Sequence, residues 1–90
     1  MTRYSIIIEG NIQGVGFRSF TQIAARRLHL TGWCKNLIDG NVQIEIQGLD
    51  ENITLFIAII KQGNNFIRVS DVYSTNVPII YSEKKFIVKY

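Results

Sequence analysis

Several residue types that mark particular protein classes are scarce in this sequence. It contains one cysteine, one histidine and one proline in 90 residues. A single cysteine cannot form an internal disulfide, and a small domain without disulfides fits a reducing compartment better than the extracellular space. One histidine, one cysteine and dispersed carboxylates cannot build a closed zinc site either. We therefore expect a cytoplasmic protein that holds no structural metal.

Long hydrophobic runs are absent as well. The longest apolar run extends only from Leu55 to Ile60, far below the roughly 20 residues that a membrane-spanning helix needs. Glu9 interrupts the isoleucines at 6–8 before the core of a secretory signal could form. We expect a soluble, unprocessed chain with no membrane partner.

The sequence has only a small excess of positive over negative charge. The formal net charge is +3, and the only adjacent basic pairs are Arg26-Arg27 and Lys84-Lys85. Such a balance helps to attract phosphates but is too weak and too scattered to identify a nucleic-acid-binding protein. With 47% apolar residues, the chain is long enough for one compact domain over residues 1–90.

Hydrophobic periodicity predicts seven elements in the order βαββαββ. The predicted strands are Tyr4–Glu9, Trp33–Leu37, Val42–Gln47, Phe66–Tyr73 and Phe86–Tyr90, and the predicted helices are Arg18–Leu28 and Glu51–Gln62. This order is typical of an α+β sandwich with two helices on one face of a largely antiparallel sheet. We expect the other face of the sheet to be relatively open.

Local signals support some of these elements. Asp39-Gly40 predicts a tight hairpin between the second and third strands. Asp50 is the expected N-cap of the second helix, and Gly63 its end. The β-branched residues of that helix also allow a strand, so the two alternatives stay open there. In the first helix, the expected core-facing stripe is Phe20, Ile23, Ala24 and Leu28.

The loop from Gly10 to Arg18 has three glycines between a strand and a helix. Glycines let successive backbone N–H groups converge on an anion, and the helix N-terminus adds its positive dipole end. Arg18 could grip two phosphate oxygens with its planar guanidinium. Taken alone, the loop is equally compatible with a tight turn and an Arg18 surface ion pair. A Walker A loop and a dinucleotide fingerprint are excluded by the spacing.

Two stretches carry a specific resemblance. The first, from Gly10 to Phe20 (GNIQGVGFRSF), resembles the signature of the acylphosphatase family, and the second, from Leu30 to Leu37 (LTGWCKNL) before Asp39-Gly40, resembles the family's second signature. The similarity continues more weakly through 63–72 and 86–90. Departures are Asn64-Asn65 in place of a proline-containing turn and Cys34 in place of an aliphatic residue.

The resemblance implies a ferredoxin-like fold and the hydrolysis of carboxyl-phosphate bonds in small acyl phosphates, without metal or cofactor. It implies that Arg18 binds the phosphoryl group together with the loop backbone amides, which belong to Gln13, Gly14, Val15, Gly16, Phe17 and Arg18. Asn36 would hold the attacking water. The expected ligands are a small acyl phosphate and inorganic phosphate, and we expect a monomer.

Two other functions are weighed against this one. The stretch 14–20 superficially resembles the RNP1 segment of RNA-binding domains, but it follows the first strand rather than lying on the third, and Val15 replaces a base-stacking aromatic residue. A non-catalytic domain that binds phosphorylated ligands is the other alternative. His29 is expected to cap a helix, and Cys34 to be a small packed hydrophobe without catalytic function.

Overall fold

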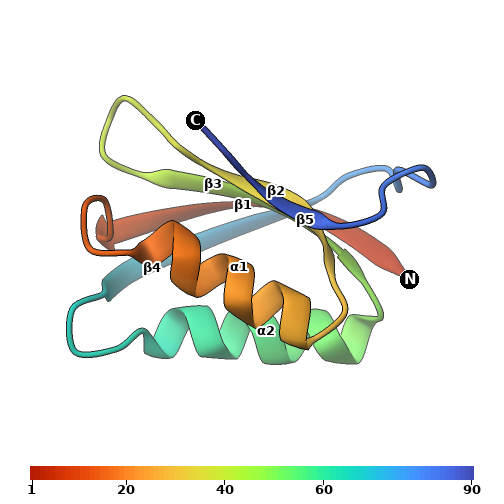
Figure 1. Ribbon diagram of the computed structural model, residues 1–90, viewed down its shortest axis with the longest axis horizontal. Coiled ribbons are helices and arrows are strands. Elements are labelled where there is room, and N and C mark those ends of the chain that lie inside the picture. Colours follow the sequence, from red (N-terminus) through yellow and green to blue (C-terminus); the bar gives the residue numbers. More distant parts are fainter.

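A computed structural model describes all residues from 1 to 90 as seven elements around one five-stranded sheet (Figure 1). In chain order they are β1 (Thr2–Asn11), α1 (Phe17–Arg27), β2 (Thr31–Asn36), β3 (Val42–Gly48), α2 (Asp50–Gln62), β4 (Arg68–Asn76) and β5 (Phe86–Lys89). The strand order is β4-β1-β3-β2-β5. All neighbouring strands are antiparallel except β2 and β5, which are parallel. The predicted element order and α+β class are confirmed.

Both helices cover the same face of the sheet, as Figure 1 shows, and the core lies between the two layers. Alternate residues of β1 and β3 point into it, for example Ile6 opposite Ile44. Alternation with period two is what a sheet covered on one face requires. The buried residues of α2 are Ile53, Phe56 and Ile60, which lie on one helical face. Because burying this face against the sheet stabilises a helix, the segment is helical although its β-branched residues also allow a strand. Neither helix has the length and apolar character needed to span a membrane.

The predicted core stripe of α1 is wrong in part. The buried residues are Phe17, Thr21, Ala24 and Ala25, whereas Ile23 is 54% exposed. The helix begins at Phe17, one residue earlier than predicted, and its large aromatic side chain is 2% exposed. Because this anchor and the two small alanines lie on one face, that face packs on the sheet and Ile23 is turned outward.

The predicted N-cap of α2 is also wrong. Leu49 holds the N-cap position without a side-chain hydrogen bond, and Asp50 is the first helical residue. Its carboxylate accepts a hydrogen bond from the Thr2 hydroxyl at 2.6 Å, and it lies with Glu51 in the first turn, where negative charge suits the helix dipole. Gly63 ends the helix as predicted.

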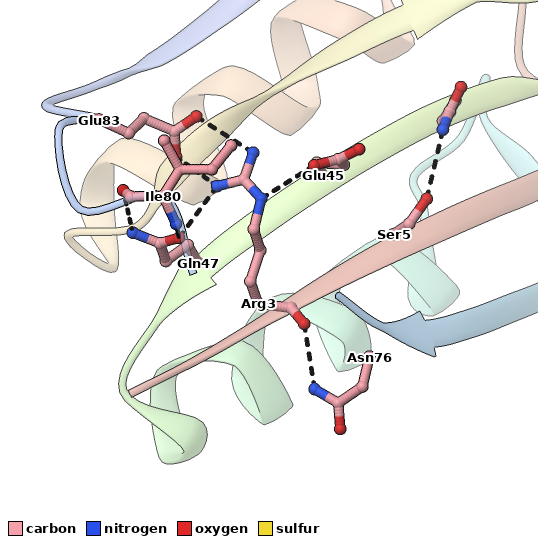
Figure 2. A network of polar contacts seen from close by, with 8 residues as sticks. Arg3, Ser5, Glu45, Gln47, Asn76, Ile80 and Glu83 are labelled. Atoms are coloured by element: carbon pink, nitrogen blue, oxygen red, sulfur yellow. Dashed lines mark hydrogen bonds and ion pairs between the residues drawn. The ribbon is translucent and has the colours of Figure 1, made fainter. Parts of the chain in front are cut away.

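The face of the sheet away from the helices is not open along its whole length. The connection 77–85 between β4 and β5 lies against it and is held by buried polar side chains (Figure 2). Arg3 bonds Glu45, Gln47 and Glu83, and Gln47 exchanges two hydrogen bonds with the backbone of Ile80. Alternation alone predicted polar residues on this face but not that Arg3 and Gln47 would be buried.

Several boundaries differ from the predicted ones. β1 starts at Thr2 and runs to Asn11, and β4 extends to Asn76 while leaving Phe66 outside. The predicted hairpin is present, since Asn36 pairs with Val42 across the β2–β3 ladder. Its loop is five residues long, closed by a hydrogen bond from the Leu37 N–H to the Asn41 carbonyl at 2.8 Å, and only Gly40 in it has a positive φ.

Candidate active site

A left-handed turn connects β1 to α1. Gly14 and Gly16 have φ values of 78° and 79°, a region that residues with a Cβ rarely adopt. A Cβ at either position would meet no atom within 4 Å, so the demand for glycine is conformational rather than steric. Gly16 is the N-cap of α1, and no side chain caps that end and no acidic residue lies in the first turn. The N-terminal amides of α1 therefore remain available to an anion.

A pocket of about 390 Å³ opens beside this turn. One side comes from the turn and from α1, and the opposite side from β2 and the C-terminal end of the chain. The residues that line it are Ile12, Gly14, Gly16, Phe17, Arg18, Ser19, Gln22, Asn36, Ile87, Val88 and Tyr90. None is acidic, and Arg18 is the only cation among them, so the pocket is suited to an anionic ligand.

Arg18 projects from the first turn of α1 toward the end of β5. Its Nη1 donates a long hydrogen bond to the Lys89 carbonyl at 3.4 Å, and its Cζ lies 4.7 Å from the centre of the Tyr90 ring. The ion pairs of the chain are both made by Arg3, so the alternative of an Arg18 surface ion pair is wrong. Arg18 keeps most of its donors free at the pocket.

Asn36 is the last residue of β2, where the strand reaches the same pocket. Its half-buried side chain makes no hydrogen bond with another residue of the chain. The turn and the hairpin are fastened together nearby, because the Gln13 amide donates to the carbonyls of Leu37 and Asn41, both at 2.8 Å. This fastening places the strand end that carries Asn36 beside the glycine turn.

The predicted loop residues divide into two groups. Gly14, Gly16, Phe17 and Arg18 line the pocket, whereas Gln13 and Val15 do not. The Gln13 side chain is used for the tie to the hairpin, and Val15 packs against the hydrophobic core. The side chains of Gln13 and Val15 thus stabilise the loop from outside the pocket.

Sequence reasoning missed three side chains with polar groups at the pocket: Ser19, Gln22 and Tyr90. Gln22 could have been found, because it lies four residues after Arg18 and such residues share a helix face. Tyr90 could not, because its position depends on the parallel pairing of β5 with β2.

Cys34 and His29 do not line the pocket. Cys34 is fully buried in β2, and burial raises the pKa of its thiol to about 11 although the Arg18 charge acts in the opposite direction. A neutral, buried thiol is a packing group rather than a nucleophile. His29 follows α1 with φ 55°, and its backbone N–H donates to the Arg26 carbonyl at 3.2 Å, which confirms its part in the helix cap.

Comparison with known proteins decides the family, because the acylphosphatase sequence pattern matches residues 4–88. The chain belongs to the acylphosphatase family. An acylphosphatase of Clostridium beijerinckii is 54% identical over 90 residues, which cover 100% of both chains. The acylphosphatase of Bacillus licheniformis is 40% identical over the full length of both. The predicted family, and with it the prediction of an acylphosphatase hydrolase, is confirmed.

Solved acylphosphatase structures give the same result for the fold. The crystal structure of acylphosphatase from Bacillus subtilis superposes with a TM-score of 0.94 at 37% identity, covering 100% of both chains. An acylphosphatase from Coxiella burnetii gives a TM-score of 0.89 at 31% identity, covering 98% of this chain and 92% of that one. The ferredoxin-like arrangement is therefore shared along the whole chain.

Proposed function

We propose that the pocket between the glycine turn and β5 hydrolyses the carboxyl-phosphate bond of small acyl phosphates, releasing a carboxylate and inorganic phosphate. The observation that carries this proposal is the meeting of three groups in one pocket: the uncapped start of α1, the Arg18 guanidinium and the unpaired amide of Asn36. The first two bind an anion, and the third can hold a neutral water.

Phosphoryl binding is assigned to Arg18 and to the backbone amides from Gln13 to Arg18, of which those of Gly14, Gly16, Phe17 and Arg18 belong to residues that line the pocket. A helix N-terminus and a planar guanidinium both favour phosphate oxygens, and the guanidinium can contact two oxygens at once. No lining residue has an acidic side chain, so no side-chain carboxylate repels the dianionic phosphoryl group there. The Lys89 carbonyl and the Tyr90 ring hold Arg18 from the side of β5.

Asn36 is the proposed water-positioning residue. Its amide can accept a hydrogen bond from water through oxygen and donate one through nitrogen without becoming charged. The water oxygen attacks phosphorus in line with the leaving group, the bond between phosphorus and the bridging oxygen breaks, and its electron pair stays on the carboxylate. One water proton passes to a phosphoryl oxygen, so the products are a carboxylate and dihydrogen phosphate.

This chemistry needs no strong base, because a carboxylate is a good leaving group. Rate then depends on positioning and on stabilising the charge of the phosphoryl oxygens. Arg18 and the loop amides supply that positive charge, so the proposed mechanism assigns no step to a metal ion or a cofactor.

Every assigned group comes from one chain, which supports a single catalytic domain over residues 1–90 acting as a monomer. A cytoplasmic location is supported by the lone, buried Cys34.

Hydrolysis of benzoyl phosphate, followed by the loss of its ultraviolet absorbance, tests the proposal. The wild type should turn over, and Asn36→Ala should lower kcat on the order of 10²-fold while competition by inorganic phosphate changes little. Asn52→Ala is the matched control, because Asn52 lies on α2, away from the pocket, and should keep full activity.

Two results would contradict the assignment. A raised KM with unchanged kcat in Asn36→Ala would make Asn36 a ground-state binding residue. A wild type that binds inorganic phosphate at Gly14–Arg18, seen as NMR shifts, but hydrolyses no acyl phosphate would instead be a phosphate-binding domain.

A further inference from the structure

Beyond Arg18 in the chain, α1 supplies two further polar residues to the lining of the pocket, Ser19 and Gln22. The part of the pocket that these two residues line is called the extension. Residues four apart on a helix have Cβ atoms about 5–6 Å from each other on one face, so the Gln22 side chain leaves α1 one turn after that of Arg18. An uncharged polar group therefore borders the place next to the proposed phosphoryl site.

Among the glutamines that are half-buried or buried, only Gln22 has a side-chain amide without a hydrogen-bond partner in the chain. The side-chain amides of the other three, Gln13, Gln43 and Gln47, each donate to a partner within the chain. Gln22 is half-buried at the pocket and makes no hydrogen bond with another residue of the chain. A polar group that is partly removed from water is stabilised when it finds a partner. Of the amides at the pocket, Asn36 shares this unpaired state. The attacking water is the proposed partner of Asn36, and a bound substrate is the partner available to Gln22.

We propose that Gln22 is a specificity-determining residue that hydrogen-bonds the acyl group of the substrate. The inference rests on the proposed function, with the phosphoryl group held by Arg18. The substituent on the acyl carbon lies three bonds from phosphorus, a span of roughly 4 Å, and a hydrogen bond of about 2.9 Å extends its reach beyond one helical turn of about 5.4 Å. A phosphoryl group at Arg18 thus brings that substituent to Gln22.

The chemistry of the extension defines the preferred acyl group. Ser19 and Gln22 can each donate and accept hydrogen bonds, and neither carries charge. The favoured substrates are therefore acyl phosphates with a neutral N–H or O–H group on the acyl carbon or beside it. A purely aliphatic acyl group of the same size leaves the Gln22 amide unpaired and binds less well in the transition state.

Acetyl phosphate and carbamoyl phosphate provide the test, because they have nearly the same shape and differ by a methyl group in place of an amino group. The readout is the ratio of kcat/KM for carbamoyl phosphate to that for acetyl phosphate, measured by phosphate release. In Gln22→Leu, which removes the amide and keeps the size, this ratio should fall about 3- to 10-fold.

Gln22→Asn and Gln62→Leu complete the experiment. Gln22→Asn keeps an amide and should restore part of the ratio, and it also serves if Gln22→Leu fails to fold by circular dichroism. Gln62→Leu makes the same substitution on α2, outside the pocket, and should leave the ratio unchanged.

The outcomes separate this inference from the proposed function. A ratio that stays constant in the Gln22 variants, or an equal loss for both substrates, would overturn the role of Gln22 in reading the acyl group while leaving acyl phosphate hydrolysis intact. A wild type that hydrolyses neither compound would overturn both.

Discussion

The guanidinium of Arg18 has five N–H donors, and the chain occupies one of them with a long bond to the Lys89 carbonyl. The remaining donors keep the fork geometry that matches two phosphate oxygens. Arg18→Lys retains the charge but loses this match, so kcat/KM for benzoyl phosphate should fall on the order of 10²-fold, and Arg18→Ala should be impaired as well.

Arg27→Lys is the control for that change, because Arg27 is exposed at the other end of α1 and does not line the pocket. Circular dichroism of each variant checks the fold. Full activity in Arg18→Lys would show that a point charge is sufficient and that paired contacts to phosphate are not part of the mechanism.

Cys34 gives a pH-dependent contribution to stability. Burial raises its pKa from 9.0 to about 11, against the opposing charge of Arg18. Below pH 9 the thiol is neutral in both the folded and the unfolded chain. Between pH 9 and 11 only the unfolded chain ionises, so stability falls as the pH rises, by about 2 kcal/mol at pH 10.5.

Cys34→Ala isolates this contribution from the lysines and tyrosines that titrate in the same range. Urea unfolding at pH 8 and pH 10.5 should show the wild type losing about 2 kcal/mol more than Cys34→Ala. Equal losses would mean that the buried thiol ionises as readily in the folded chain as in the unfolded one.

Single residues were predictable where local chemistry demands a residue type. The glycines of the turn and Arg18 stand out because positive φ and a guanidinium at a helix start are unusual requirements. Asn36 was found only through resemblance to a family, since an asparagine at a strand end has no distinctive local signal. Tyr90 and the partners of Arg3 depend on strand pairing over long sequence separations, which periodicity does not encode.

At the scale of elements, periodicity predicted which segments form helices and strands, but not which residues start and end them. Strand ends depend on the partner: β4 continues to Asn76 because β1 pairs with it as far as Tyr4. The N-terminus of α2 similarly follows from the way β3 leads into Leu49, whose carbonyl accepts the hydrogen bonds from Asn52 and Ile53. Such contacts form in the folded sheet and override local capping preferences.

At the C-terminal end of α1, one residue with a Cβ adopts a left-handed backbone conformation that glycine would adopt at lower cost. His29 adopts φ 55° and, with Leu30, closes the helix by hydrogen bonds to the carbonyls of Arg26 and Ala25, the Schellman arrangement in which glycine is usual. A left-handed conformation costs a residue with a Cβ about 1–2 kcal/mol, part of which glycine gives back through its more flexible unfolded state. His29→Gly should therefore stabilise the protein by about 0.5–1 kcal/mol.

Thermal unfolding checks this, with an expected rise in Tm of about 2–8 °C for a domain of this size. His29→Ala is the matched control, since it removes the imidazole but keeps the Cβ, and should give no such rise. An equal gain in both variants would assign the effect to the imidazole instead of the backbone.

At the scale of the whole molecule, the connection 77–85 joins opposite edges of the sheet. It carries the chain from β4, at one edge, to β5, at the other. Arg3 fastens it to the sheet: the guanidinium contacts Glu83 through two hydrogen bonds of 2.8 and 3.2 Å and Glu45 through one of 2.8 Å (Figure 2). Burial opposes the charge of Arg3, but both carboxylates favour it, and its pKa is raised above the ordinary value.

The contacts between Arg3 and the connection 77–85 link the stability of the fold to the candidate active site. β5 follows directly after the connection and supplies Ile87, Val88 and the carbonyl of Lys89 to the pocket and to Arg18. Glu83→Gln removes one of the two charges that compensate the fully buried Arg3 side chain. The free energy of unfolding should fall by about 2–3 kcal/mol, because a hydrogen bond to a charged group is lost in a place that water barely reaches.

The loss of stability in Glu83→Gln should also differ between strands. With the connection loosened, the amides of 86–89 should exchange with solvent faster by a larger factor than those of β1 and β3, which remain paired in the middle of the sheet. Urea unfolding and amide hydrogen exchange measure the two effects. Glu51→Gln, the same change at an exposed residue of α2 without an ion pair, removes only a favourable interaction with the helix dipole and should cost less than about 1 kcal/mol. Uniform acceleration across β1, β3 and β5 would show that the Arg3 contacts stabilise the sheet as a whole and do not specifically hold β5 against the site.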